Sequence, residues 1–233
     1  MPGKVLFVLS SHDHMLSGKP TGWYLPEAAH PYYQVKKAGY EVVFASPKGG
    51  KAPLDPSSVE AFKDDAEAQQ FLNDAEIKKE VDNTVKLSEV KASDFVAYFA
   101  VGGHGPVFDL TDSAENQKLI LDFYNSKKPT ASVCHGPTVF LKIEENGERF
   151  VKGKKVTCFS DEEEEQADLV KEIPFLVEKE LRAAGAEFQL SRKAWGEEVV
   201  IDEQDGKILL TGGNPASASA LGAAVVKAIK ARE

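Results

Sequence analysis

The chain alternates short, almost continuously apolar runs with amphipathic stretches of helical length, and this alternation limits the possible folds more than any other feature. The apolar runs occupy residues 4–10, 41–46, 95–101, 130–133 and 155–159. Strands that are apolar throughout are typical of parallel sheets, because helices cover both faces of such a sheet. The pattern therefore predicts an α/β fold around a mostly parallel sheet.

The stretches between these runs predict the helices and one hairpin. Residues 198–201 and 207–211 are expected to pair antiparallel across Asp205-Gly206, a dipeptide typical of hairpin turns. Residues 53–90 are rich in Asp, Glu, Lys and Ala, and they are too few and too polar to hold a core of their own. We expect them to form a helical insertion on a single domain that spans residues 1–233. The other helices are expected at residues 26–38, 115–125, 137–143, 173–184 and 216–231.

Composition excludes several classes of function. The formal net charge of −9 over 233 residues disfavours a nucleic-acid binder and a protein of anionic membrane surfaces, because both need an excess of Lys and Arg. Two cysteines exclude a disulfide framework and predict a reducing, cytoplasmic environment. No apolar run approaches the roughly 20 residues that cross a bilayer, and residues 5–9 are too few for a signal-peptide core.

The most informative motif is residues 130–137, Thr-Ala-Ser-Val-Cys-His-Gly-Pro. It places Cys134 at a turn between a strand and a helix, since Pro137 suits a first helical turn. Such a turn lifts a nucleophile out of the sheet, as in the elbow of hydrolases. The positive end of the helix dipole would favour the thiolate of Cys134. The alternative is a buried, inert cysteine.

A second motif, Gly102-Gly103-His104-Gly105, follows the strand expected at residues 95–101. Glycine allows backbone N–H groups to approach a ligand closely, and ligands of open α/β sheets bind at the carboxyl edge of the strands. We therefore take Gly102, Gly103 and His104 as candidates for binding substrate and an oxyanion. A plain tight turn explains the glycines equally well.

Acidic residues at two places belong to the same expected edge. Glu27 follows Pro26 and falls in the first turn of a helix, where a Glu usually serves only the helix dipole. It could instead present a carboxyl beside Cys134 as a proton donor or base. Most of the acidic run at residues 161–165 is expected on the surface, but one member could orient a histidine, as in a catalytic triad. We expect Cys158 in the core.

Other chemistries lack their signatures. The histidines at 12, 14 and 30 have no zinc-type spacing with cysteines or carboxylates, so no metal is expected. Neither a Gly-x-Ser-x-Gly elbow nor a Walker A loop is present. The Gly-Gly-Asn of residues 212–214 could bind an anion, although a packing turn is the simpler reading.

Four motifs together resemble the ThiJ/PfpI superfamily, at residues 21–31, 102–105, 131–137 and 213–217. They are most similar to its heat-shock chaperone-like branch, the glutathione-independent glyoxalase III enzymes of fungi and bacteria. The resemblance runs over nearly the whole chain. It implies a flavodoxin-like three-layer sandwich, a homodimer, and no cofactor.

The resemblance also implies roles for individual residues. Cys134 would be the nucleophile, His135 its neighbouring histidine and Glu27 the carboxyl beside the thiol. The acidic member falls in residues 161–165, and aligning Phe159-Ser160-Asp161 with the family's strand end selects Glu164. Cys158 stands where the family pattern leads us to expect a glycine, which would crowd the site or add a second thiol.

These residues suit the chemistry of a 2-oxoaldehyde. The Cys134 thiolate would add to the aldehyde of methylglyoxal, and Glu27 or His135 would move a proton from C1 to C2 through an enediol. Hydrolysis of the resulting thioester would release lactate. Backbone N–H groups of Gly103 and His135 would meet the developing negative charge. A holding chaperone, and a peptidase or deglycase of glycated amines, remain open alternatives.

Overall fold

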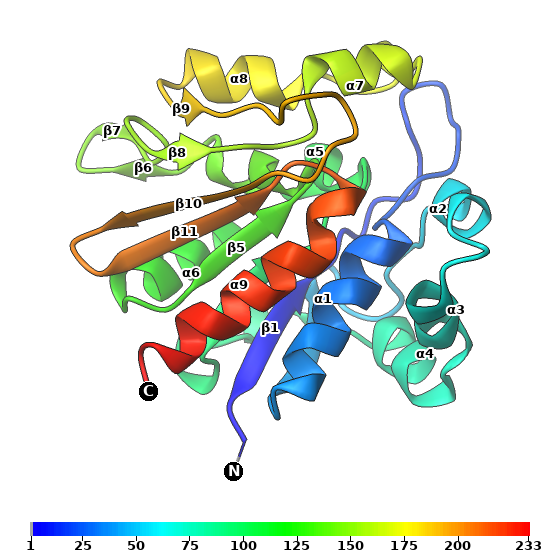
Figure 1. Cartoon of the computed structure of the whole chain (residues 1–233), viewed down its shortest axis with the longest axis horizontal. Coiled ribbons are helices and arrows are strands. Elements are labelled where there is room, and N and C mark those ends of the chain that lie inside the picture. Colours follow the sequence, from blue (N-terminus) through cyan, green and yellow to red (C-terminus); the bar gives the residue numbers. More distant parts are fainter. Residues whose placement is uncertain (1) are drawn as a thin grey trace.

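A seven-stranded sheet forms the centre of the computed structural model, which describes residues 2–233 (Figure 1). The strand order is β10-β11-β5-β4-β1-β2-β3. Every neighbouring pair is parallel except the β10–β11 hairpin. The strands are β1 (Lys4–Val8), β2 (Glu41–Ser46), β3 (Val85–Lys86), β4 (Ala97–Ala100), β5 (Thr130–Val133), β10 (Val199–Gln204) and β11 (Lys207–Gly212).

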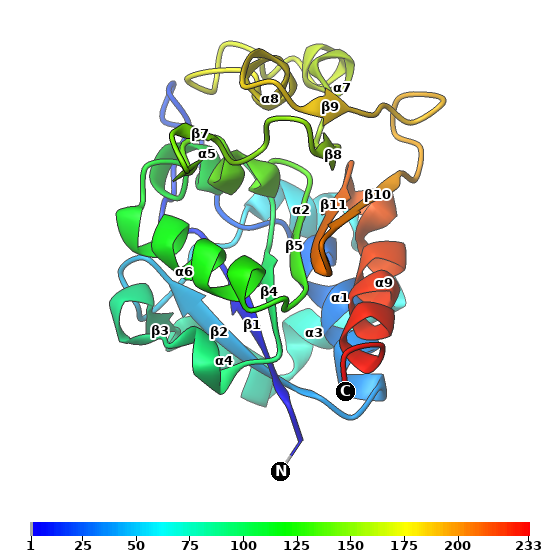
Figure 2. The same cartoon turned by 90° about the vertical axis from the view of Figure 1, so that its left-hand side faces the viewer.

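Helices cover both faces of this sheet, and the expected three-layer α/β sandwich is confirmed (Figure 2). Helices α1 (Leu25–Lys37) and α9 (Ala218–Lys230) pack against each other on one face. Helix α6 (Ala114–Asn125) lies on the other. Successive side chains of β1 point to opposite faces, so that Phe7 joins the core under α1 and α9 while Leu6 joins the core under α6.

Residues 53–90 form the expected helical insertion. It contains α2 (Pro56–Ala61), α3 (Ala66–Asn73) and α4 (Ala75–Asp82), and an aspartate side chain caps the N-terminus of each helix. Phe71 and Ile77 are buried in the core beneath α1, which fixes the insertion to the domain. Two short 3₁₀ helices, η1 (Leu87–Glu89) and η2 (Ala92–Asp94), lead from it to β4.

The expected strand at residues 155–159 is wrong as a member of the central sheet. Only β8 (Lys155–Val156) forms, and it pairs with β9 (Glu187–Phe188) in a separate two-stranded sheet. The antiparallel strand β10 already occupies the free edge of β11, so no ladder position remains there. Another separate hairpin joins β6 (Glu144–Glu145) to β7 (Glu148–Arg149).

Two predicted helices are shorter than expected. The helix expected at residues 137–143 is a 3₁₀ helix, η3 (Gly136–Phe140). The helix expected at residues 173–184 starts later, as α8 (Val177–Ala183), and Leu176 before it has an extended backbone. The remaining elements are α5 (Gly105–Asp109), α7 (Asp161–Gln166) and η4 (Pro215–Ser217). None of the helices in residues 2–233 has the length and apolar character needed to cross a membrane.

Candidate active site

The carboxyl ends of β1, β4, β5 and β11 meet at one edge of the sheet, and Cys134 lies there directly after β5. Its backbone has a φ of 59°, which is rare for a residue other than glycine. Its N–H donates to Gly212 O at 2.9 Å and its carbonyl accepts from Phe159 N at 2.9 Å. These two bonds hold a conformation that costs about 1–3 kcal/mol, as expected for a nucleophile elbow.

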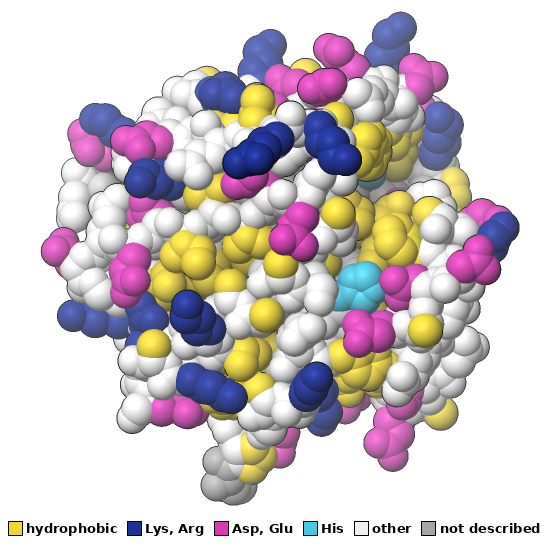
Figure 3. Space-filling view, viewed as in Figure 1, with side chains coloured by type: hydrophobic (Ala, Val, Ile, Leu, Met, Phe, Trp, Pro, Cys, Tyr) yellow, Lys and Arg dark blue, Asp and Glu magenta, His cyan; other side chains and the backbone are white. Residues whose placement is uncertain are grey.

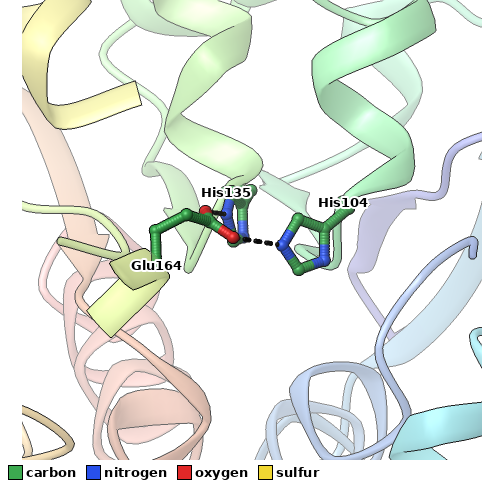
Figure 4. Close-up of side chains that lie close together, drawn as sticks. All are labelled: His104, His135 and Glu164. Carbon is green, nitrogen blue, oxygen red and sulfur yellow. Dashed lines mark hydrogen bonds and ion pairs between the residues drawn. The ribbon is translucent and has the colours of Figure 1, made fainter. Parts of the chain in front are cut away.

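The Cys134 side chain begins a chain of hydrogen bonds through His135 to Glu164. Its Sγ lies 3.2 Å from Nδ1 of His135, and Nε2 of the same ring lies 2.5 Å from Oε2 of Glu164. The other oxygen of Glu164 contacts Nε2 of His104 at 2.8 Å, so that one carboxylate lies between two imidazoles (Figure 4). Of the acidic run at residues 161–165, Glu164 is therefore the member that reaches the histidine beside the thiol.

The charges in this cluster determine which atoms carry protons. Burial raises the pKa of Glu164, but the charges and hydrogen bonds of His135 and His104 outweigh burial and hold that pKa well below its usual range. Burial lowers the pKa of His135, and the neighbouring His104 adds to this effect against the opposing charge of Glu164. A neutral His135 that donates through Nε2 to the carboxylate leaves Nδ1 free to accept the thiol proton.

Glu27 approaches the thiol from α1. Its side chain is completely buried, and neither carboxyl oxygen has a hydrogen-bond partner of good geometry among the described residues. A Cβ added to Gly102 would lie 2.2 Å from Oε2 of Glu27 and 2.8 Å from Cβ of Cys134. Gly102 therefore leaves the space in which the carboxyl and the cysteine meet.

The surroundings of Glu27 favour its protonated form. Burial raises its pKa to about 8, and the charge of Asp55 adds to the rise, whereas the Cys134 thiol and the N–H groups of Gly102 and Gly103 oppose it. The carboxyl is thus mostly neutral at pH 7 and can donate a hydrogen bond toward the sulfur.

The expectation of a low thiol pKa is wrong for the resting site. Burial raises the pKa of Cys134 well above its usual value, and any negative charge on Glu27 raises it further. The 3₁₀ helix that follows has only five residues and supplies little dipole. Backbone N–H groups of Gly103 and His135 act in the opposite direction and favour the thiolate. The thiol is therefore the resting form, and a base must remove its proton.

A pocket of about 100 Å³ opens onto Cys134. Glu27, Gly103, His104 and His135 also line it, so most of the site residues expected from sequence meet there. The rest of the wall is largely apolar and comes from Met15, Tyr24, Phe159, Leu169 and Trp195, among others. In the space-filling view, hydrophobic side chains surround a hollow below the α7 segment (Figure 3). A larger cavity of about 370 Å³ beside α3 and α4 has neither cysteine nor histidine in its lining.

His104, His135 and Glu164 are also the side chains of this site that could hold a metal ion. One ligand atom from each lies within 4.8 Å of the others. In the structure the two Nε2 atoms face the same carboxylate, and the three side chains satisfy one another. The cluster therefore needs no ion to explain its geometry.

Several features of the site were not expected from sequence. His104 pairs with Glu164 in addition to lining the pocket, and Trp195 forms part of the wall without belonging to any motif. Trp195 lies in an irregular loop, where no periodic pattern signals its position. Cys158 is buried, as expected for a core residue, and its thiol donates to Phe159 O at 3.1 Å. The side chain of Asn214 caps η4 by accepting a hydrogen bond from Ala216 N.

Known proteins resemble this chain in sequence over nearly its full length. The chain is 32% identical to glyoxalase 3 of Candida albicans over 224 residues, which is 92% of this chain and 93% of that protein. It is 30% identical to the glutathione-independent glyoxalase HSP31 of Saccharomyces cerevisiae over 238 residues, covering 98% and 99% of the two chains.

A solved structure gives the same result. The crystal structure of glyoxalase III from Candida albicans superposes with a TM-score of 0.85 at 30% identity, covering 97% of each chain. The DJ-1/PfpI family matches residues 22–228, a range that contains Cys134, His135, Glu164, His104 and Glu27. The resemblance seen in the four motifs is therefore confirmed, and the chain belongs to the DJ-1/PfpI family.

Proposed function

We propose that this protein is a glutathione-independent glyoxalase that converts methylglyoxal to lactate. The observation that carries the proposal is the surroundings of one thiol. Sγ of Cys134 lies 3.2 Å from an imidazole nitrogen and shares a small buried pocket with the Glu27 carboxyl. The names of the two curated relatives support the same activity.

In the first step Cys134 attacks the aldehyde carbon, C1. Nδ1 of His135 takes the thiol proton as the sulfur–carbon bond forms, and the aldehyde oxygen becomes negative. Backbone N–H groups of Gly103 and His135, which favour negative charge at the sulfur, would stabilise this oxygen as well. Return of the proton from His135 to the oxygen gives a neutral hemithioacetal.

In the second step two protons move and no external oxidant is needed. His135 removes the proton from C1 while the neutral Glu27 carboxyl protonates the oxygen on C2, which gives an enediol. His135 then returns its proton to C2, and Glu27 recovers a proton from the oxygen on C1. The product is a 2-hydroxy thioester: C1 has been oxidised and C2 reduced within the same molecule. A Glu27 pKa of about 8 suits a group that gives and regains a proton near neutral pH.

In the last step water hydrolyses the thioester. The water oxygen bonds to C1, the sulfur leaves, and Cys134 regains its proton. The net reaction adds one water to methylglyoxal and releases lactate. Glu164 keeps His135 oriented throughout through the bond to Nε2.

The proposal extends to assembly and location. We expect a homodimer in the cytoplasm whose partner is a small 2-oxoaldehyde, in keeping with the net charge of −9 and with the family to which the chain belongs. Size-exclusion chromatography with light scattering tests the dimer, and a monomer at micromolar concentration would contradict it.

The decisive experiment measures lactate formed from methylglyoxal without glutathione. Cys134→Ala and Cys134→Ser should abolish lactate formation, while the matched control Cys158→Ser should retain most of it, because Cys158 lies outside the pocket. Full turnover by Cys134→Ala would refute the covalent mechanism. If wild-type protein forms no lactate but suppresses client aggregation equally well with and without Cys134, the chain is a holding chaperone instead.

A further inference from the structure

Trp195 has an unusual combination of properties. Its side chain lines the pocket of Cys134, yet it is 47% exposed to solvent. Its φ of 62° lies in the left-handed region, where bulky residues are true outliers. Such conformations persist only where the surroundings hold them, and they gather at ligand clamps and active sites.

Three contacts hold Trp195 in place. Its backbone N–H donates to Oε1 of Glu163 at 2.7 Å, and its indole Nε1 donates to Oε1 of Gln166 at 2.6 Å. The edge of its ring packs on Phe159, with centroids 5.3 Å apart. Phe159 in turn lies 4.7 Å from the ring of His135. The indole is therefore packed, through one aromatic ring, against the imidazole beside the nucleophile.

Glu163 makes the backbone anchor rigid. Its carboxylate is almost fully buried and accepts four hydrogen bonds: Oε1 accepts from Trp195 N and from Asn214 Nδ2, and Oε2 accepts from the N–H and the hydroxyl of Ser160. The same short helix, α7, presents Glu164 to the histidines. A buried carboxylate with every partner in place costs much to disrupt, so the loop around Trp195 is fixed to the catalytic helix.

The pocket has a polar side and an apolar side. The proposed mechanism places C1 and the two carbonyl oxygens beside Cys134, Glu27 and Gly103. The substituent on C2 must then lie toward the apolar wall, which includes Phe159 and Trp195. A pocket of about 100 Å³ leaves little room there.

We propose that Trp195 is a specificity-determining residue that closes the pocket over Cys134 and restricts it to 2-oxoaldehydes with a small substituent on C2. The inference rests on the proposed glyoxalase function and adds its substrate class. A methyl group fits beneath the indole, whereas a phenyl group requires the indole to move.

The first experiment compares methylglyoxal with phenylglyoxal. Trp195→Ala should raise the ratio of kcat/KM for phenylglyoxal to that for methylglyoxal by about tenfold or more, the usual range for steric contacts in an apolar pocket. Leu190→Ala is the matched control, because Leu190 is 54% exposed on the same segment and does not line this pocket. An unchanged ratio in Trp195→Ala would overturn the proposal.

The second experiment needs no turnover. In a Cys158→Ser background, Cys134 is alkylated with iodoacetamide or with the larger N-phenylmaleimide. Trp195→Ala should accelerate the reaction with N-phenylmaleimide about tenfold more than the reaction with iodoacetamide. Equal acceleration of both, or of neither, would refute the closing role of Trp195. Trp195→Leu serves the same comparison if Trp195→Ala does not fold.

The two experiments separate the two proposals. Size-selective alkylation without turnover of either aldehyde by wild-type protein would refute the glyoxalase function and support the closing role of Trp195. Turnover of methylglyoxal by wild-type protein, with no size selectivity lost in Trp195→Ala, would refute the role of Trp195 and leave the glyoxalase function supported.

Discussion

Replacement of Glu27 by Gln should make the protein more stable and less active, and both effects follow from one buried carboxyl. In the folded chain the pKa of Glu27 is about 8, against 4.5 for an ordinary Glu. As pH rises above 4.5 the unfolded chain loses this proton while the folded chain keeps it. Folding stability due to this group is therefore complete below pH 4.5 and is lost progressively up to pH 8.

The size of the effect follows from the same interval. Each pH unit between the two pKa values changes the free energy of unfolding by about 1.4 kcal/mol. Between pH 5 and pH 8 the wild-type protein should thus lose up to about 4 kcal/mol that Glu27→Gln, which cannot ionise, does not lose. The advantage of Glu27→Gln should be small at pH 5 and grow toward pH 8.

Turnover should move in the opposite direction. Gln keeps a hydrogen-bond donor beside the sulfur but cannot exchange a proton, so kcat should fall by roughly 10²–10⁴, the usual worth of general acid–base catalysis. Because Glu27 and Cys134 are in contact, their titrations should be coupled in the wild-type protein. In Glu27→Gln the rate of thiol alkylation should rise with pH in a single step.

Urea unfolding at pH 5, 7 and 8 measures the stability difference, and lactate formation measures kcat. Glu67→Gln is the matched control, because Glu67 is an exposed first-turn Glu of α3 and should change stability by no more than about 1 kcal/mol at any of these pH values. A stability difference that does not vary with pH would refute the raised pKa. Near-normal kcat would show that Glu27 does not transfer the proton and would leave that role to His135.

Three further predictions concern the same site. Mild peroxide should oxidise Cys134 to the sulfinic acid before Cys158, because Cys134 opens onto the pocket and its sulfur lies 3.2 Å from Nδ1 of His135, which can take the thiol proton, whereas the Cys158 thiol donates to Phe159 O; mass spectrometry that finds the product first on Cys158 would contradict this. Glu164→Gln should lower kcat by roughly 10²–10⁴ in steady-state assays, since the imidazole beside the thiol loses its carboxylate partner, and unchanged kcat would exclude that role. Gly102→Ala should abolish activity and lower the melting temperature, because its Cβ would lie 2.2 Å from a carboxyl oxygen of Glu27; a crystal structure with both side chains undisturbed would refute the close approach.

The strands and the hairpin were predictable because their signals are local. The bounds of β2 and β5 match the expected ranges, since Glu41 and Pro47 mark the ends of the first run and Pro129 precedes the second. The β10–β11 hairpin turns at Asp205-Gly206, where both residues have positive φ as this dipeptide predicts. The strand at residues 155–159 failed because a run of apolar residues does not reveal whether a sheet edge is free.

The candidate site likewise has features that the sequence predicts and features that it does not. Motifs predicted that Cys134, His135 and Glu27 lie at one edge of the sheet, because each stands beside a turn or a helix start that has its own sequence signature, and the three side chains line one pocket. The raised pKa of the thiol could not be predicted, since it arises from burial and from a carboxyl more than 100 positions earlier in the chain. Trp195 was also unpredictable, because its position depends on hydrogen bonds to Glu163 and Gln166, which are distant in sequence.

Two consecutive carboxylates on α7 perform separate tasks, and their proximity has a consequence for how the enzyme can evolve. Glu163 fixes the wall of the pocket and Glu164 fixes the histidines. A capping box at Ser160 holds the first turn of this helix, so neither carboxylate can shift without moving the other. Mutations in α7 that enlarge the pocket should therefore also impair catalysis, whereas the side chain at position 195 can change alone. Adaptation to larger aldehydes should accordingly begin in the loop, with the helix sequence held constant by selection.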